Sequence, residues 1–327
     1  MTASGDGMHK ATIAAAIATA LCATQASSQS ETYPSRPIRM LVGFPAGGPS
    51  DVPARVIAEK MRALGQPVVV ENKTGAAGMI ALNDMLSQPR DGYTLLLCSY
   101  IDPTNALLYK KVSYKLDDIA PVSLISKAYY AFTVPASSPA NNMSEFVALA
   151  KAKPGALNYG KVGNGSVTEL LPRQLEKLAG ITMTGVSFRG TGPAMQEIVA
   201  GRLDFMVGPM ALAMPFYDEK KVKIIGMTSP ERLPLAPDVP TLKEQGLAID
   251  NHGWWGVCAA SGTPQPILDV VNRQVREAVA SADYKAVMER AGAIPVSSTS
   301  AEFARLFHET AAEAGTMIRE LGIEQLN

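Results

Sequence analysis

A glycine-rich turn follows the first strand-like run of the chain and has the residue types of an anion-binding loop. The apolar run 38–44 leads into Pro45-Ala-Gly-Gly-Pro-Ser-Asp51, and a helix-like segment begins directly after it. Such a turn directs backbone N–H groups at the space above the strand end, where the helix dipole adds partial positive charge. Because the turn contains no lysine or arginine, the sequence predicts a small anion held by the N–H groups of Ala46, Gly47 and Gly48.

Two further glycine-rich turns occupy the same kind of position, between a strand and a helix. They are Asn72-Lys-Thr-Gly-Ala-Ala-Gly78 and Gly163-Asn-Gly-Ser166. In open α/β sheets, ligands bind at the carboxyl ends of the strands, where all three turns are expected. A single glycine turn often serves only to permit a positive φ angle, but three of them in two structural units favour a ligand site in the cleft between the units.

Several polar residues near these turns have a structural alternative. Ser50 could be the N-cap and Asp51 a first-turn acid that stabilises the next helix. Ser166-Val-Thr-Glu169 matches a capping box. Arg189 follows another predicted strand and could bind a carboxylate through its guanidinium, or form an ion pair with Asp204 instead.

Aromatic and acidic residues near other strand ends are candidates for ligand specificity. Tyr100 and Asp102 follow the third predicted strand, although Asp102 could equally be a solvated turn residue before a proline. Trp254 and Trp255 are the two tryptophans of the chain and lie in one predicted strand. Strand alternation therefore places one of them toward the cleft and the other in the core.

Catalytic machinery is not visible in the sequence. Beyond the N-terminal segment, the histidines are His252 and His308, and both have plausible structural roles. There is no nucleophile elbow, zinc-protease helix, Cys-x-x-Cys pair or phosphate-loop lysine motif. Without a base beside a nucleophile, covalent catalysis has no support. No catalytic residue, metal ligand or cofactor is therefore predicted.

The apolar runs around these turns predict two α/β units. Alternating strands and helices imply sheets of parallel strands covered by helices. Strands are expected at residues 38–44, 67–71, 93–99, 131–134, 157–160, 184–187, 203–207, 223–228 and 253–259. Helices are expected at residues 53–64, 79–87, 143–151, 167–179, 193–200, 265–281, 284–291 and 300–321.

The chain is expected to cross between the two units twice. The crossings fall near residues 135–139 and 250–253, and two crossings are typical of a hinged pair of lobes. Lobe 1 is therefore assigned residues 31–134 plus 252–327, and lobe 2 residues 135–251.

The N-terminal segment and the composition indicate an exported globular protein. A short basic start, an alanine-rich apolar stretch and small residues after it predict a signal peptide over residues 1–26, too short to span a membrane. Across 327 residues the formal net charge is zero, so binding to nucleic acid or to anionic membranes has no electrostatic drive. We therefore expect a periplasmic protein with no nucleic-acid partner.

Two cysteines remain beyond the signal peptide. Cys98 and Cys258 each lie late in an apolar, strand-like run. In an oxidising compartment they could pair, and buried free thiols are equally compatible with the sequence. The sequence supplies no Cα–Cα distance that would decide between these alternatives.

Over residues 31–327 the chain resembles the substrate-binding proteins of the tripartite tricarboxylate transporter family, also called Bug or TctC receptors. Several short motifs together carry the resemblance. They are Tyr33-Pro-Ser-Arg-Pro-Ile38, Phe44-Pro-Ala-Gly-Gly48, Glu71-Asn-Lys-Thr-Gly-Ala-Ala-Gly78, Asp91-Gly-Tyr-Thr94, Gly163-Asn-Gly-Ser166, Phe188-Arg-Gly190 with Gly192-Pro193, Pro237-Asp-Val-Pro-Thr241 and Gly262-Thr-Pro264.

The resemblance implies a two-lobed, type II-like periplasmic binding protein of the α/β class, with a mainly parallel sheet flanked by helices in each lobe. It implies a monomer that closes on a small aliphatic or aromatic carboxylate and delivers it to membrane transporter subunits. Backbone groups and ordered waters from the first two loops hold the carboxylate in that family. The predicted ligand-binding residues are Phe44, Pro45, Ala46, Gly47, Gly48, Asp51, Thr74, Gly75, Ala76, Ala77, Gly78, Tyr100, Asp102, Gly163, Asn164, Gly165, Ser166, Arg189 and Trp255.

Three departures from the family pattern surround the distal end of this expected site. Glu169 stands where histidine is frequent, Phe188-Arg189 where tyrosine-lysine is common, and Tyr100-Ile-Asp102 where the family often has small polar residues. They leave the expected carboxylate anchor intact, but the resemblance does not define the rest of the ligand. A ligand sensor feeding a two-component system would have the same pocket, and an exported small-acid enzyme using His252 as its base is the remaining alternative.

Overall fold

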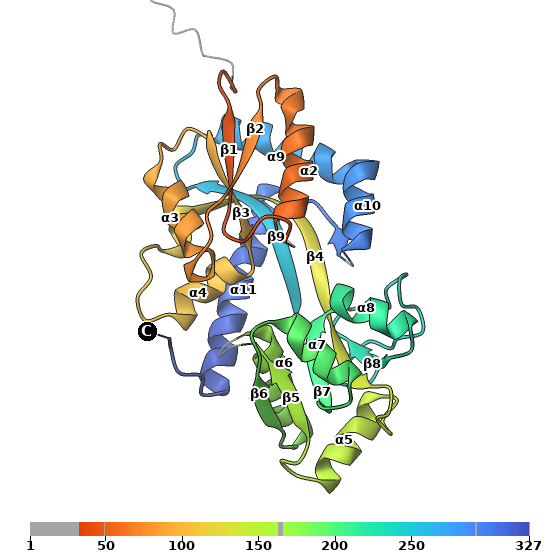
Figure 1. The fold of residues 1–327 in the computed structure, drawn as a ribbon. Helices are drawn as coiled ribbons and strands as arrows, with labels where there is room; N and C mark the ends of the chain where they lie inside the picture. Colours follow the sequence, from red (N-terminus) through yellow and green to blue (C-terminus); the bar gives the residue numbers. More distant parts are fainter. Residues whose placement is uncertain (1–32, 49, 163–165, 292, 327) are drawn as a thin grey trace, which may run out of the picture. The chain divides into compact units, whose positions relative to one another are not determined.

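The computed structural model describes residues 33–48, 50–162, 166–291 and 293–326. The signal peptide expected over residues 1–26 lies outside these ranges. Residues 36–327 form one compact unit, which carries all the elements named below (Figure 1). None of the helices in the described residues is both long enough and apolar enough to span a lipid bilayer.

The compact unit alternates strands and helices along its length. The strands are β1 (Ile38–Val42), β2 (Val68–Asn72), β3 (Thr94–Ser99), β4 (Ile119–Pro135), β5 (Asn158–Lys161), β6 (Thr184–Ser187), β7 (Phe205–Pro209), β8 (Val222–Met227), β9 (His252–Ala260) and β10 (Ile294–Pro295). The α-helices are α2 (Asp51–Met61), α3 (Met79–Ser87), α4 (Ile101–Leu108), α5 (Met143–Ala152), α6 (Val167–Ala179), α7 (Thr191–Val199), α8 (Met210–Asp218), α9 (Gln265–Ala280), α10 (Ala282–Arg290) and α11 (Ser300–Glu320). Short 3₁₀ turns are η1 (Arg62–Leu64), η2 (Ala76–Gly78) and η3 (Leu116–Asp118).

A first strand set is built on the parallel strands β2, β1 and β3. β9 joins β3 in the antiparallel direction, and β4 joins β9 in the same way. Helices α2, α9 and α10 pack together on one side of this set, and α4 packs against α11 on the other (Figure 1). The ends of β1, β2 and β3 therefore lie beside one another, as a shared ligand site requires.

A second strand set repeats this plan. β6, β5 and β7 are parallel, and β4 pairs with β7 and β8 in the antiparallel direction. β4 serves both sets, because it pairs with β9 up to Tyr129 and with β7 and β8 from Tyr130 onward. β9 begins opposite Tyr129, at His252. These two strands connect the sets, as expected of a two-lobed binding protein.

The predicted fold class is confirmed, with one refinement. The parallel core of each strand set is present, but the sheet as a whole is mixed because the connecting strands β4 and β9 join in the antiparallel direction. The change of partners within β4, between Tyr129 and Tyr130, falls inside the segment assigned to lobe 1. The lobe boundaries themselves stay a prediction.

Most predicted elements are present, and two helices were missed. Helix α4 follows β3 directly, where a connection was expected, and α8 lies in a segment for which the sequence predicted no element. β4 begins at Ile119, well before the expected start at 131. The first half of the strand was missed because β4 is buried along almost its whole length and therefore shows no alternation of apolar and polar residues. Helix α6 runs from Val167 to Ala179 with Pro172 inside it, as expected for the helix bounds.

The connecting strands are anchored by the core. Trp254 is fully buried and packs edge-on against Phe303 of α11, with ring centroids 5.1 Å apart. Cys98 of β3 and Cys258 of β9 form a disulfide, with Cα atoms 5.8 Å apart. Of the two alternatives that the sequence left open, a disulfide and buried free thiols, the structure has the disulfide.

Candidate functional site

The first glycine-rich loop is closed on itself. The N–H of Gly47 donates to the Asp51 carboxylate at 2.8 Å, and the N–H of Gly48 donates to the carbonyl of Pro45 at 3.2 Å. Two of the three N–H groups predicted to hold a ligand anion are therefore already used. Of those three, the Ala46 N–H is the one with no acceptor among the described residues. The loop is shaped by its own carboxylate.

Asp51 is the centre of this loop. Its side chain is 1% exposed and also accepts hydrogen bonds from Arg55 Nε and Asn72 Nδ2, both at 2.8 Å. Burial alone would raise the pKa of Asp51, but the hydrogen bonds from Arg55, Gly47 and Asn72 outweigh it and lower the pKa below the ordinary carboxyl value. Asp51 is therefore an ionised part of the loop structure.

The second loop is tied to the first. Asn72 Nδ2 donates to the carbonyl of Phe44 at 3.0 Å as well as to Asp51. The two backbones also touch, since a Cβ on Gly43 would lie 2.7 Å from the Cα of Gly78. No larger residue fits at Gly43, so the two loops behave as one platform.

The backbone of the second loop is strained. Ala76 and Ala77 have φ angles of 45° and 52°, which residues with a side chain rarely adopt. The amide of Asn105, on α4, supports this turn by donating to the carbonyl of Ala77 at 3.0 Å. Strain of this kind is typical of functional loops. Of the predicted residues here, Thr74, Gly75 and Ala76 are exposed, Ala77 is half-buried and Gly78 is buried.

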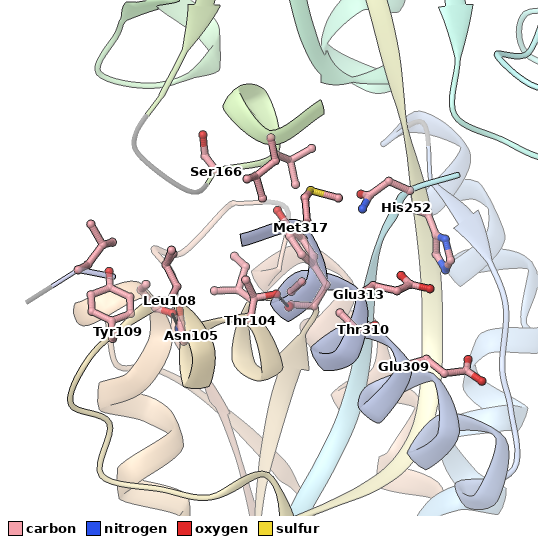
Figure 2. A pocket seen from close by; sticks show the side chains of 18 of the residues that line it. Thr104, Asn105, Leu108, Tyr109, Ser166, His252, Glu309, Thr310, Glu313 and Met317 are labelled. Atoms are coloured by element: carbon pink, nitrogen blue, oxygen red, sulfur yellow. Dashed lines mark hydrogen bonds between the residues drawn. The ribbon is translucent and has the colours of Figure 1, made fainter. Parts of the chain in front are cut away.

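Two cavities adjoin this platform and share Tyr100. The first, the α4–α11 cavity, has a volume of about 570 Å³. Figure 2 shows it between α4 and α11, with Ser166 beside the start of α6. Its lining includes Ala77, Tyr100, Thr104, Asn105, Ser166, His252, Glu309, Glu313 and Met317.

The second cavity, the Trp255 cavity, has a volume of about 490 Å³. It lies between the first loop, the crossing strands, α10 and the junction of β7 with α8. Its lining is Gly47, Gly48, Val52, Pro53, Tyr100, Ser126, Ala128, Tyr130, Pro209, Met210, Ala211, Trp255, Val287, Met288, Arg290, Ala291 and Ala293.

The α4–α11 cavity has an acidic character. Glu309 and Glu313 line it, and none of its described lining residues is lysine or arginine. Burial, together with the charges of Asp250 and Glu309, raises the pKa of Glu313. His252 supplies no compensating charge at neutral pH, because burial and nearby Lys127 lower its pKa to about 4. Both carboxylates are exposed to solvent, so the like charge that they present to a carboxylate ligand is partly screened, but it still makes this cavity the less favourable of the two.

The Trp255 cavity has the opposite character. No aspartate or glutamate lies among its described lining residues, and its lining includes one cation, Arg290. Trp255 lines it while Trp254 is in the core, so the predicted alternation is confirmed. The indole Nε1–H of Trp255 donates to Ser50 Oγ at 3.0 Å. Ser50 was expected to cap α2, but its side chain makes no cap hydrogen bond and holds Trp255 instead.

The Tyr100 ring separates the two cavities. Tyr100 and Tyr130 converge over Gly253, where an added Cβ would lie 2.8 Å from the Tyr130 hydroxyl and 3.3 Å from Tyr100 Cε1. Burial raises the pKa of Tyr100, and the neighbouring Tyr130 hydroxyl lowers it in part. Both rings are therefore neutral walls at physiological pH.

Other predicted site residues lie away from both cavities. Asp102 is in the first turn of α4, not in a solvated turn. It is 6% exposed, and its carboxylate accepts from the Ser99 N–H at 2.6 Å. Burial raises its pKa to about 7. Arg189 is exposed and forms no ion pair with Asp204, whose carboxylate accepts from the Asn158 N–H instead.

The third loop departs from its expected capping box. The Ser166 side chain makes no cap hydrogen bond to α6, and Glu169 forms an ion pair of 2.7 Å with Lys161. The Glu169 side chain is only 8% exposed. Gly163, Asn164 and Gly165 lie outside the described residues.

Some residues of the candidate site were missed by sequence reasoning. Asn72 joins the two loops, and Tyr130, Met210 and Arg290 line the Trp255 cavity. Asn72 stood in a motif that marked the resemblance, which was a usable signal. The others come from segments read as strand interior, connection or helix end, so only the fold brings them together. Among the described residues, no group of His, Cys, Asp and Glu side chains is arranged to hold a metal ion.

Comparisons with known proteins agree with this architecture. The model of the TctC family, described as "Tripartite tricarboxylate transporter family receptor", matches residues 53–323. The periplasmic binding protein BugD is 29% identical to this chain. Its structure superposes with a TM-score of 0.73 over 90% of this chain and 100% of its own.

Two related structures contain ligands. MatC (Rpa3494) from Rhodopseudomonas palustris, with bound malate, is 31% identical over 88% of this chain and 100% of its own, with a TM-score of 0.71. R. palustris Rpa4515, with adipate, is 26% identical over 90% of this chain and 100% of its own, with a TM-score of 0.77. Malate and adipate are both carboxylates.

Proposed function

The chain belongs to the tripartite tricarboxylate transporter receptor (TctC) family, and from that premise we propose that it captures a small organic carboxylate in the Trp255 cavity. The family and its solved relatives are solute-binding receptors rather than enzymes. We further propose that the loaded receptor delivers this ligand to a membrane transporter of the tripartite tricarboxylate type.

The charge difference between the two cavities is the observation that carries the proposal. The Trp255 cavity has Arg290 and no acid among its described lining residues, whereas Glu309 and Glu313 line the α4–α11 cavity. Desolvating a carboxylate without a compensating partner is costly, and a like charge adds to that cost. A carboxylate therefore has lower free energy in the Trp255 cavity.

The Trp255 cavity is bounded by both strand sets. Gly47 and Gly48 come from the loop after β1, and Pro209, Met210 and Ala211 come from the junction of β7 with α8. The start of α8 has no side-chain cap, so its first N–H groups and its dipole can receive an anion. A carboxylate here would bridge the two sets and favour their closure, and reopening would release it.

The related structures with malate and adipate support a carboxylate as the ligand class. The solved relative BugD is named a periplasmic binding protein. Together with the signal sequence expected over residues 1–26, this supports a periplasmic location and export by signal-peptide cleavage for this chain.

A thermal-shift panel tests ligand capture. Mono- and dicarboxylates, aromatic and aliphatic, are added to the purified protein, and a ligand raises the melting temperature because it binds only the folded state. Two half-buried alanines give matched variants: Ala211→Glu places an acid in the Trp255 cavity, and Ala314→Glu places one in the α4–α11 cavity.

Ala211→Glu is expected to remove the shift and Ala314→Glu to keep it. The reverse pattern would assign the site to the α4–α11 cavity, and a panel without any shift would refute carboxylate capture. Delivery is tested separately, by uptake of the radiolabelled ligand in cells with and without the gene. Equal uptake rates would refute the transport role.

A further inference from the structure

We infer that the ligand of the Trp255 cavity is a monocarboxylate with an aromatic or aliphatic apolar body. This inference rests on the proposed function and narrows the ligand class. The cavity offers counter-charge for one carboxylate, and most of its remaining lining is apolar.

The walls of the cavity are mostly apolar, with the hydroxyl groups of Ser126 and Tyr130 as neutral polar exceptions. Trp255 and Tyr100 contribute aromatic faces, and Met210 and Met288 contribute flexible thioether side chains. Aromatic rings and methionine side chains suit a flat or flexible hydrocarbon body. At about 490 Å³, the cavity lies in the range of small-molecule sites.

The polar atom of the Trp255 ring does not face a ligand. Its Nε1–H is donated to Ser50 Oγ at 3.0 Å, which fixes the ring against the first loop. Trp255 therefore presents ring surface to the cavity and keeps its donor for the protein. The same hydrogen bond holds the ring in place before a ligand arrives, so little side-chain entropy is lost on binding.

A second carboxylate has no suitable place. Within the Trp255 cavity, Arg290 is the one cation among the described lining residues, and the start of α8 is the other positive feature. Beyond Tyr100, a longer dicarboxylate would enter the α4–α11 cavity, where Glu309 and Glu313 lie. Burying a second charge near these carboxylates, without a partner, costs several-fold in affinity or more.

Matched acid pairs test this inference by calorimetric titration. Hexanoate and adipate have the same chain length, and benzoate and terephthalate have the same ring, so each pair differs by one carboxylate. We expect the monocarboxylate of each pair to bind at least ten-fold more tightly, equivalent to about 1.4 kcal/mol. A ratio below ten-fold in either pair overturns the inference while leaving carboxylate capture intact.

Absence of binding by all four acids and by the wider panel would instead refute the proposed function itself. Two variants sharpen the result. Trp255→Leu is expected to weaken monocarboxylate binding at least ten-fold, with an unliganded melting curve as the check on folding. Val287→Lys adds a second cation to the half-buried lining of α10, and is expected to raise adipate affinity at least ten-fold; unchanged adipate affinity contradicts the role assigned to charge.

Discussion

The backbone N–H of Gly47 donates a 2.8 Å hydrogen bond to the carboxylate of Asp51, so the glycine-rich turn holds an anion of its own. The Asp51 carboxylate also accepts hydrogen bonds from the side chains of Arg55 and Asn72, and Asp51 is almost fully buried. The turn is therefore organised before any ligand is present. Its contribution to binding is the shape of the platform beneath the Trp255 cavity, more than direct donation from Gly47.

Removing the Asp51 carboxylate should loosen this platform. Asp51→Ala leaves the Gly47 N–H without its acceptor and removes one of the two acceptors of Asn72 Nδ2, and should lower the unfolding free energy by about 2 kcal/mol. Because the folded-state pKa of Asp51 is lowered, its stabilisation is present above the ordinary carboxyl pKa and is lost as the pH falls through the folded-state value. Urea unfolding at several pH values measures both effects.

Asp283→Ala is the matched control for Asp51→Ala. Asp283 is exposed and pairs only with Lys60 in the described contacts, so its removal should leave the unfolding midpoint unchanged. Equal effects of the two substitutions would contradict the organising role of Asp51.

The amide of Asn72 should matter more for ligand affinity than for stability. Asn72→Ala removes the hydrogen bonds to Phe44 and Asp51 that join the first two loops. We expect the unfolding free energy to fall by about 1 kcal/mol. The free energy of carboxylate binding, measured by calorimetry, should fall by a larger fraction of its wild-type value. Asn83→Ala, on α3, is the control, since its side-chain partner Ser113 lies outside both loops. An unchanged carboxylate affinity in Asn72→Ala would contradict the inference that the two loops act in binding as one platform joined by Asn72.

His252 should make the protein acid-sensitive. Burial, aided by Lys127 and opposed by Asp250, lowers its pKa from 6.5 to about 4. The neutral ring is therefore favoured in the folded state, and the related stability is complete above pH 6.5 and lost as the pH falls toward 4. As the pH falls from 6.5 to 4, the unfolding free energy of the wild type should therefore decrease by about 3 kcal/mol more than that of His252→Gln.

The control for the histidine measurement is His308→Gln, because His308 is exposed on α11. Its unfolding free energy should follow the wild-type pH curve. A His252→Gln curve that also parallels the wild type would contradict the buried, neutral state of His252.

The disulfide between Cys98 and Cys258 should contribute strongly to stability. It joins β3 to β9 across a sequence separation of 160 residues, and closing so long a loop in the unfolded chain is worth about 4 kcal/mol. Reductant should lower the melting temperature of the wild type and leave the Cys98→Ala/Cys258→Ala double variant unchanged. A non-reducing digest without the linked peptide would contradict the bond.

Sequence patterns were sufficient for the outline of the fold. Apolar runs identified β1, β2 and β3, and the glycine turns after β1 and β2 identified the loops that follow these two strands, because each pattern is local. Alternation within β9 also assigned one tryptophan to the core and one to a cavity. What these patterns lack is information on long-range pairing, such as the exchange of β4 partners between Tyr129 and Tyr130.

Less of the candidate site than of the fold could be predicted, because the site depends more on long-range contacts. The sequence indicated an anion at the first loop but could not show that Asp51 already occupies the Gly47 N–H. Nor could the sequence indicate which arginine lines the cavity. Arg290 does so, whereas Arg189, the predicted ligand-binding arginine, is exposed and lines neither cavity. Such assignments depend on contacts between segments far apart in the chain.

Intrinsic fluorescence of Trp255 tests the central claim most directly. The tightest carboxylate of the panel is titrated into the wild type and into Trp255→Phe, with calorimetry on both samples to establish binding. We predict a saturable change in wild-type emission that is absent in Trp255→Phe, since Trp254 is buried away from the cavity. An undiminished change in Trp255→Phe, or an unchanged wild-type spectrum with calorimetrically proven binding, would contradict capture of the carboxylate in the Trp255 cavity.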